Sequence, residues 1–314
     1  MHDVNEDSGE AARRRRLNAN IALLVMTIIW AVNFSVAKIA LQKVTPLAFN
    51  ALRFPLAAAA LYILLRRKGP IALPPRRDLF RVLMLGLLGN VLYQQFFIFG
   101  LNQTRAGTAS LLLAGTPLIT AVLSATLGHE RVPGKVWIGV GCTLLGISFV
   151  VLFGSPDPDQ TQSTGLGALL LLSASCSWAV YTVGARDLVA RHGAIAVTAW
   201  TLWIGSVGVF LVGLPAVVQT DLRAISPGIW AAVFYAGVLS VGVAYLFWYN
   251  GVRELGNTRT STYSNLVPVI TLLVAWLWLG ENPSIGQLAG AATIIGGVTL
   301  AQSGGIAPVE PPHE

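Results

Sequence analysis

The sequence has 314 residues, of which 54% are hydrophobic and 11% are charged, and its mean hydropathy is +0.66. About a quarter of the residues of a soluble domain are charged, and a water-soluble fold cannot hide so much apolar surface. The composition therefore excludes an ordinary soluble protein. The net charge of +7 does not indicate nucleic-acid binding, because the basic residues lie between apolar runs and form no basic domain.

Ten apolar segments follow one another along the chain, each close to the roughly 20 residues that cross a bilayer as a helix. Glycine, proline and charged residues separate them. We therefore predict an all-α integral membrane protein. The predicted spans are residues 18–41, 46–65, 79–101, 106–127, 135–153, 165–185, 194–214, 227–252, 257–279 and 284–303.

The basic residues predict the orientation of these spans. Short loops rich in Lys and Arg stay on the cytoplasmic side of a membrane. Arg13 to Arg16 precede the first span, and Arg66, Arg67 and Lys68 follow the second. Both termini are therefore predicted to be cytoplasmic. The N-terminal segment precedes a full-length span, so we do not expect a cleaved signal peptide.

The two halves of the chain repeat each other. Residues 100–146 align with residues 251–297 at a shift of 151 without a gap, and Trp30-Ala31-Val32 aligns with Trp178-Ala179-Val180 at a shift of 148. Five spans per copy is an odd number, so the second copy must be inverted relative to the first. Inverted repeats around a central site are typical of transporters.

The predicted architecture is thus two inverted five-helix repeats around a central cavity. Its parts are a cytoplasmic basic N-terminal tail (1–17), the first repeat (18–153), an external linker (154–164), the second repeat (165–303) and a cytoplasmic C-terminal tail (304–314).

Acidic residues are absent from the centres of the predicted spans. This argues against proton exchange through a buried carboxylate and favours a passive or weakly coupled carrier. The sequence also lacks phosphate-loop, zinc-helix and nucleophile-elbow motifs. We therefore expect no enzyme activity, no cofactor and no metal.

The mid-span positions instead carry amides and aromatic rings. Trp30, Asn33 and Phe34 share one helical face, and similar faces recur in other spans. Uncharged polar groups beside rings suit a small zwitterionic substrate with an apolar part, although packing or interhelical hydrogen bonds would also explain them. The candidate substrate-binding residues are Trp30, Asn33, Phe34, Asn90, Tyr93, Gln94, Phe97, Trp178, Tyr181, Tyr245, Trp248 and Asn265.

Two prolines and two glutamates occupy matched places in the repeats. Pro117 and Pro268 fall near the middle of the fourth and ninth spans, where each removes a backbone donor and predicts a hinge or an exposed binding segment. A kink needed only for packing is the alternative. Glu130 and Glu281 follow these spans and are either loop caps or partners in gating salt bridges.

Two basic residues lie within predicted spans. Arg53 is about two turns into the second span and either extends to the membrane surface or faces the cavity and meets a carboxylate. Lys38 is nearer the end of its helix and is expected to reach the surface.

Several segments resemble the EamA family of the drug/metabolite transporter superfamily: Trp30-Ala31-Val32-Asn33-Phe34, Leu127-Gly128-His129-Glu130-Arg131 and Trp276-Leu277-Trp278-Leu279-Gly280-Glu281. The resemblance covers about residues 18 to 303. The chain departs from the family pattern at Ala31, where Gly is common, and at His129, which separates the usual Gly-Glu pair.

This resemblance implies a bacterial inner-membrane carrier, a monomer or weak homodimer in the lipid bilayer, that exports small neutral amino acids, aromatic ones included, or related metabolites by alternating access. The alternative within the superfamily is an exporter of multiple drugs, quaternary cations or nucleosides.

Overall fold

The computed structural model describes residues 3–67, 69–127, 130–131, 133–153, 164–255, 260, 263–303 and 307–308. Nearly all of these residues are helical. Two short strands, β1 (Glu130–Arg131) and β2 (Ala307–Pro308), pair antiparallel. The all-helical class predicted from the sequence is therefore confirmed, with this one small contact added.

The helices of the first half begin and end where the sequence supplies caps and breaks. Thr45, for example, precedes α2 and its hydroxyl accepts a hydrogen bond from the Ala48 N–H, while Pro46 occupies the first turn. The elements are α1 (Asp3–Leu41), α2 (Pro46–Arg66), the 3-10 turn η1 (Arg76–Asp78), α3 (Leu79–Gly86), the π-helical segment η2 (Leu87–Leu92), α4 (Tyr93–Asn102), α5 (Ala106–Leu113), α6 (Thr116–Thr126) and α7 (Gly134–Phe153).

The second half follows the same scheme. Gly193 separates two long helices with a φ of 81°, a left-handed conformation that glycine adopts readily. The elements are α8 (Thr164–His192), α9 (Ala194–Gln219), α10 (Pro227–Phe234), the π-helical segment η3 (Tyr235–Val243), α11 (Ala244–Leu255), α13 (Val267–Leu279) and α14 (Ile285–Ser303).

Eight continuous helical stretches are long and apolar enough to cross a membrane, and they follow the order of the first eight predicted spans. Two further apolar helices, Val267–Leu279 and Ile285–Ala301, are shorter. The eight stretches are Arg13–Leu41, Pro46–Arg66, Arg76–Asn102, Ala106–Thr126, Gly134–Phe153, Gly165–His192, Ala194–Gln219 and Pro227–Gly251.

Some boundaries differ from the prediction. The helix α1 begins at Asp3, inside the predicted tail, because Glu, Ala and Arg in this segment are good helix formers. The helix α8 continues to His192, two turns past its predicted end, and stops at Gly193, whose positive φ ends the helical conformation. The predicted linker, residues 154–164, lies almost wholly outside the described residues.

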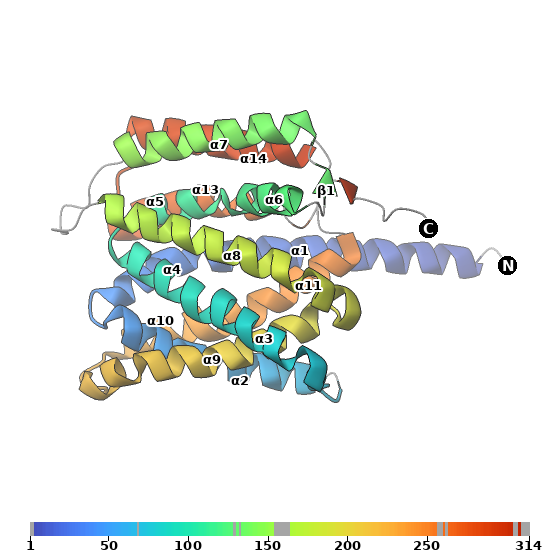
Figure 1. Ribbon diagram of the computed structural model, residues 1–314, viewed down its shortest axis with the longest axis horizontal. Helices are drawn as coiled ribbons and strands as arrows, with labels where there is room; N and C mark the ends of the chain where they lie inside the picture. The colour runs from blue at the N-terminus through green and yellow to red at the C-terminus, as the bar shows by residue number, and fades with distance from the viewer. Residues whose placement is uncertain are drawn as a thin grey trace.

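The helices α7 and α14 lie side by side at one edge of the molecule (Figure 1). Their backbones approach closely at four glycines. A Cβ atom on Gly139 would lie 2.5 Å from the Gly297 carbonyl oxygen, and one on Gly146 would lie 2.8 Å from that of Gly290. Since residue 139 meets 297 and residue 146 meets 290, the two helices run antiparallel. They are repeat-related, so this contact fits an inverted repeat.

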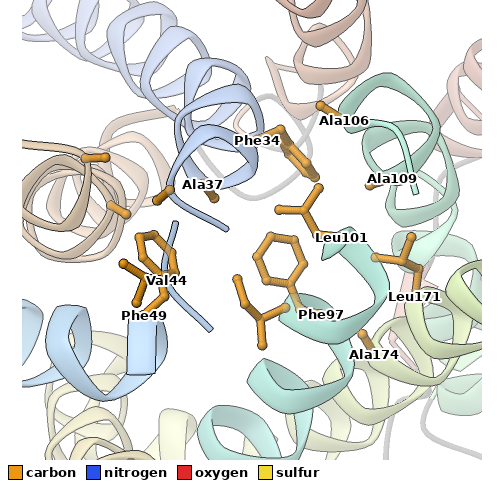
Figure 2. Packing of buried hydrophobic residues seen from close by; sticks show 14 of the residues in the cluster. Phe34, Ala37, Val44, Phe49, Phe97, Leu101, Ala106, Ala109, Leu171 and Ala174 are labelled. Atoms are coloured by element: carbon orange, nitrogen blue, oxygen red, sulfur yellow. The ribbon is translucent and has the colours of Figure 1, made fainter. Parts of the chain in front are cut away.

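At the opposite edge α2 packs against α9, and α1 and α8 run between the two edges (Figure 1). The largest buried cluster joins these layers. It contains Phe34, Phe49, Phe97 and Leu101, contributed by α1, α2 and α4 (Figure 2).

The glycine contact generates a stability prediction. The substitution Gly297→Ala places a methyl group 2.7 Å from the Gly139 carbonyl oxygen and 2.7 Å from Thr143 Oγ1. We expect the free energy of unfolding to fall by about 1–3 kcal/mol, the usual cost of overpacking. Thermal unfolding of the purified protein in detergent measures this change.

The neighbouring substitution Gly296→Ala is the matched control, because a Cβ atom there meets nothing within 4 Å. It should leave the unfolding temperature unchanged or raise it slightly. Equal unfolding temperatures for the two variants would show that α7 and α14 do not pack this tightly.

Candidate functional site

Aromatic side chains from distant segments meet inside the protein. The Trp30 ring lies 6.4 Å from the Tyr245 ring, edge to face, and 5.7 Å from the Trp248 ring, between centroids. The Trp30 indole N–H also donates to the Ser240 carbonyl oxygen at 2.9 Å. These contacts join α1 to η3 and α11, so they connect the first repeat to the second.

A second run of rings joins α1, α4 and α8. Phe34 lies edge to face with Phe97 at 5.8 Å, and Tyr93 stacks on Phe97 at 6.1 Å (Figure 2 shows Phe34 beside Phe97). Trp178 lies 5.0 Å from Tyr93 and 5.1 Å from Tyr181. The aromatic cluster is defined as Trp30, Phe34, Tyr93, Phe97, Trp178, Tyr181, Tyr245 and Trp248.

The four predicted amides have different surroundings. Asn90 Nδ2 donates to the Thr201 carbonyl oxygen at 3.1 Å, an interhelical hydrogen bond. Asn33 is 6% exposed, and its Oδ1 has no hydrogen-bond partner among the described residues. It is one of eight buried side-chain polar atoms without a partner among the described residues, and a bound water, ion or substrate would complete its hydrogen bonding. Asn265 is half-buried in the turn before α13.

Gln94 belongs to a polar contact with Arg53. The Arg53 Nη2 donates to Gln94 Oε1 at 2.9 Å, and its Nε donates to Asn50 Oδ1 at 3.0 Å. The expectation that Arg53 extends to the membrane surface is wrong, because its side chain is buried. Among the described residues it meets amides and not the expected carboxylate. Asn50 was missed, although its position three residues before Arg53 places both side chains on one helical face.

The prolines lie at breaks in their spans. The fourth span is divided into α5 and α6 by a turn at residues 114–115, and Pro117 sits in the first turn of α6. Pro268 likewise sits in the first turn of α13, after a turn at residues 265–266. Each proline therefore lies at an interruption of its span, as the sequence predicted, and it sits in the first turn of the new helix, where its missing N–H costs nothing. A hinge role stays a prediction.

Both repeats also contain a π-helical segment, which no sequence pattern foretold. At the 151-residue shift, Leu87–Leu92 corresponds to residues 238–243, inside η3. The segment η2 ends directly before Tyr93. The segment η3 ends at Val243, so that only Ala244 separates it from Tyr245. Such π-helical turns occur frequently at functional sites because they turn side chains out of the regular α-helical register.

Lys38 and Glu281 hold the junction between α4 and α5. Lys38 is buried and does not reach the surface. Its Nζ donates to the carbonyl oxygens of Leu101, Asn102 and Thr104 at 3.3, 3.2 and 2.6 Å. A cation at the C-terminal end of a helix is favourable, so Lys38 stabilises the end of α4.

Glu281 acts on the beginning of the next helix. Its Oε1 and Oε2 accept hydrogen bonds from the N–H groups of Ala106 and Gly107 at 2.9 and 3.1 Å. Burial raises the pKa of Glu281 above its usual value, and the two backbone hydrogen bonds oppose this shift. Glu281 is thus a cap for α5, supplied by the other repeat. Glu130 lies in β1, and a gating role stays a prediction for both residues.

A charged cluster at the ends of η1 and α8 was not predicted. Asp78 accepts hydrogen bonds from Nη1 and Nη2 of Arg191 and contacts Nε2 of His192, each at 2.9 Å. Arg81 pairs with Asp187 nearby at 2.9 Å. The only signal in the sequence was the positive charge near the ends of these spans. The pairing itself could not be predicted, because the partners are over 100 residues apart in the chain.

A pocket of about 310 Å³, half open to the surface, lies beside this charged cluster, between α3, α6 and α8, and is called the cavity below. Its lining includes Arg81, Leu123, Val183 and Asp187. None of the predicted substrate-binding residues lines this cavity. It lies toward the end of the molecule that the basic loops assign to the cytoplasm.

The described helices and their paired halves define a multi-pass membrane protein. The EamA-like transporter family matches the chain twice, over residues 17–152 and 165–302. The chain belongs to this family, and it is therefore a transporter of the EamA type.

Relatives of similar length support this assignment. The uncharacterized transporter YyaM of Bacillus subtilis (strain 168) is 30% identical over 288 residues, which cover 91% of this chain and 94% of the relative. A "Probable terminal-alkyne amino-acid exporter" of Streptantibioticus cattleyicolor is 29% identical over 289 residues, with 91% and 94% covered. A solved crystal structure aligns with a TM-score of 0.63 at 21% identity over 90% of this chain and 98% of its own, which shows the fold alone.

The cap on α5 generates a prediction. The substitution Glu281→Ala removes the acceptors of the Ala106 and Gly107 N–H groups. Losing a helix cap costs about 0.5–2 kcal/mol, so thermal unfolding of the purified protein should shift to lower temperature.

Asp221→Ala is the control, because Asp221 is exposed in the loop after α9 and the substitution removes the same charge. The acceptor that is lost there serves only the Arg223 N–H in the same loop and no helix of the membrane region. It should unfold like the unmodified protein. If both variants are equally stable, Glu281 does not stabilise the α4–α5 junction.

Proposed function

We propose that this protein exports small neutral amino acids, aromatic ones included, or closely related metabolites across the bacterial inner membrane. The transport cycle is alternating access between two inverted repeats. The observation that carries the proposal is the aromatic cluster with its unpaired Asn33 acceptor, where rings and uncharged polar groups from both repeats come together.

The chemistry of the aromatic cluster supports an amphipathic substrate. Aromatic side chains offer apolar faces to a ligand, while the tyrosine hydroxyls and the Trp N–H offer hydrogen bonds. A pocket of this kind holds an apolar body and orients it through a few polar groups. One relative is named "Probable terminal-alkyne amino-acid exporter", which agrees with an amino-acid substrate.

Charge argues against the alternative of an organic-cation exporter. Aromatic rings alone can bind a quaternary ammonium group. The charged side chain next to Phe97 is however a cation, Arg53, whose guanidinium carbon lies 5.9 Å from the ring centroid. A second cation placed here would be repelled, since like charges interact strongly where water is scarce.

The two ends of the protein differ, one being held closed and the other having a pocket, and this difference supports alternating access. Glu281 and Lys38 hold α4 and α5 at the end assigned to the external side. The cavity between α3, α6 and α8 lies toward the opposite end. We propose that this cavity admits substrate from the cytoplasm while the external end is closed.

Counterflow in liposomes tests the proposal. Purified protein is reconstituted in liposomes loaded with unlabelled phenylalanine, tryptophan or methionine, and labelled phenylalanine is added outside. We expect the label to accumulate transiently without an ion gradient, because exchange needs only the carrier. Liposomes loaded with arginine or glutamate should not accumulate it.

Protein-free liposomes give the background. If every amino acid fails to drive counterflow while ethidium or nucleosides exchange, the amino-acid substrate class is wrong and one of the alternatives replaces it.

The unpaired amide gives a second prediction. Asn33→Ala should slow labelled phenylalanine exchange about fivefold, which corresponds to one hydrogen bond of about 1 kcal/mol. Its unfolding temperature should stay close to that of the unmodified protein, because Asn33 Oδ1 bonds to none of the described residues. Initial exchange rates per amount of folded protein provide the measurement.

Asn18→Ala is the control, since Asn18 is exposed on the same helix. A variant Asn33→Ala that loses stability but exchanges at the normal rate would show that this amide is structural.

A further inference from the structure

Arg53 is a buried cation in the middle of an apolar environment. It is the eighth residue of α2, about 10 Å along the helix from Pro46. Its side chain is 1% exposed and is the largest fully buried side chain of the described residues. Ionisable residues inside membrane spans are costly and usually mark functional sites.

All the contacts of Arg53 are with neutral groups. Its guanidinium donates to the amide oxygens of Asn50 and Gln94, and its carbon lies 5.0 Å from the Phe49 ring centroid and 5.5 Å from that of Phe54. A guanidinium has five N–H donors, so these two hydrogen bonds leave donors unused. No ion pair joins Arg53 to a carboxylate within the described part of the chain.

The described carboxylates with resolved contacts are engaged elsewhere. Asp78 binds Arg191 and His192, and Glu281 binds the N–H groups at the start of α5. Amide dipoles and aromatic faces offset only part of the cost of burying a charge, which amounts to several kcal/mol. The positive charge of Arg53 therefore lacks a negative partner among the described residues.

The fold itself does not require this cation. The helix α9 occupies the corresponding place in the second repeat, and its 26 residues, Ala194–Gln219, contain no Asp, Glu, Lys or Arg. A buried ion can often be replaced by an apolar side chain without loss of stability. Packing of the helix therefore does not explain why α2 carries a buried arginine.

Arg53 also touches the aromatic cluster. Its guanidinium lies 5.9 Å from the Phe97 ring, which stacks on Tyr93. A ligand bound to Arg53 would therefore have its apolar part among the rings of the cluster.

We infer that Arg53 binds the carboxylate of the transported molecule, and that this carboxylate decides which aromatic molecules are carried. The inference rests on the proposed function and narrows its substrate class to monocarboxylates with an apolar or aromatic body. A planar carboxylate matches the guanidinium fork, whereas a phosphate dianion would need a second cation that the site lacks within the described residues.

The amino group of a substrate has a lesser role in this site. The hydrogen bonds and ring contacts given above for the aromatic cluster involve no carboxylate, so an ammonium group finds neutral acceptors, such as Asn33 Oδ1 and the tyrosine hydroxyls, and the ring faces. Arg53 is buried in the present conformation and bonded to Gln94 of α4, so binding requires α4 to move relative to α2, as alternating access provides.

Competition against labelled phenylalanine tests the inference on the unmodified protein. Liposomes loaded with phenylalanine take up the label while one unlabelled competitor is present outside. The competitors are 3-phenylpropionate, which lacks the amino group, and phenylalaninamide, which lacks the carboxylate. We expect 3-phenylpropionate to compete at least about tenfold better than phenylalaninamide, the effect of losing one buried charge pair.

Variants of Arg53 test the same point. Arg53→Gln should slow phenylalanine exchange about tenfold or more and remove the preference for 3-phenylpropionate over phenylalaninamide. Arg53→Lys keeps the charge and should keep the preference with weaker binding. Arg66→Gln is the matched control, since Arg66 is exposed at the end of the same helix, and it should behave like the unmodified protein.

The outcomes separate this inference from the proposed function. If phenylalaninamide competes as well as 3-phenylpropionate, the role of Arg53 is wrong while amino-acid export stands. If 3-phenylpropionate exchanges and no amino acid does, carboxylate recognition stands and amino-acid export is wrong. If neither class exchanges or competes, both are overturned. Should Arg53→Gln fail to fold, the competition on the unmodified protein still decides.

Discussion

A bilayer offers no water to unpaired backbone groups, and this constraint decides where the chain can depart from a regular helix. The departures are few and occur at related places in the two repeats. The π-helical segments end just before Tyr93 and Tyr245, and the turns at residues 114–115 and 265–266 precede the two prolines. Irregular backbone inside a membrane protein survives only where protein or a cavity surrounds it, and the two π-helical segments adjoin tyrosines of the aromatic cluster.

The scaffold is nearly symmetric while the candidate site is not. Gly139 and Gly146 of α7 meet Gly297 and Gly290 of α14 in a reciprocal, antiparallel contact. Two units related in this way can exchange conformations around a common centre. The buried charge of α2 has no counterpart in α9. In the proposed mechanism, the repeat allows the movement, and the charge that only α2 carries recognises the substrate.

Charges elsewhere in the described structure are used to fix helix ends. Lys38 stabilises the C-terminal end of α4, Glu281 caps α5, and Arg191 binds Asp78 at the start of the third span. Each of these groups meets a complementary dipole or charge at a helix end. Arg53 differs from them because it lies within a helix among neutral groups, and this difference makes it the candidate for binding an anionic part of the substrate.

The sequence by itself determined the membrane class, the order of the first eight spans, the repeat and the family, because hydropathy and repetition are properties of local residue order. It also indicated Trp30, Tyr93 and Trp248 as site candidates from helical spacing. Only the tertiary structure decided which side chains meet. The Arg53–Gln94 contact, the Asp78–Arg191 pair and the cap that Glu281 places on α5 join residues 41, 113 and 175 positions apart. Such pairings depend on how helices pack, which spacing along one helix does not specify.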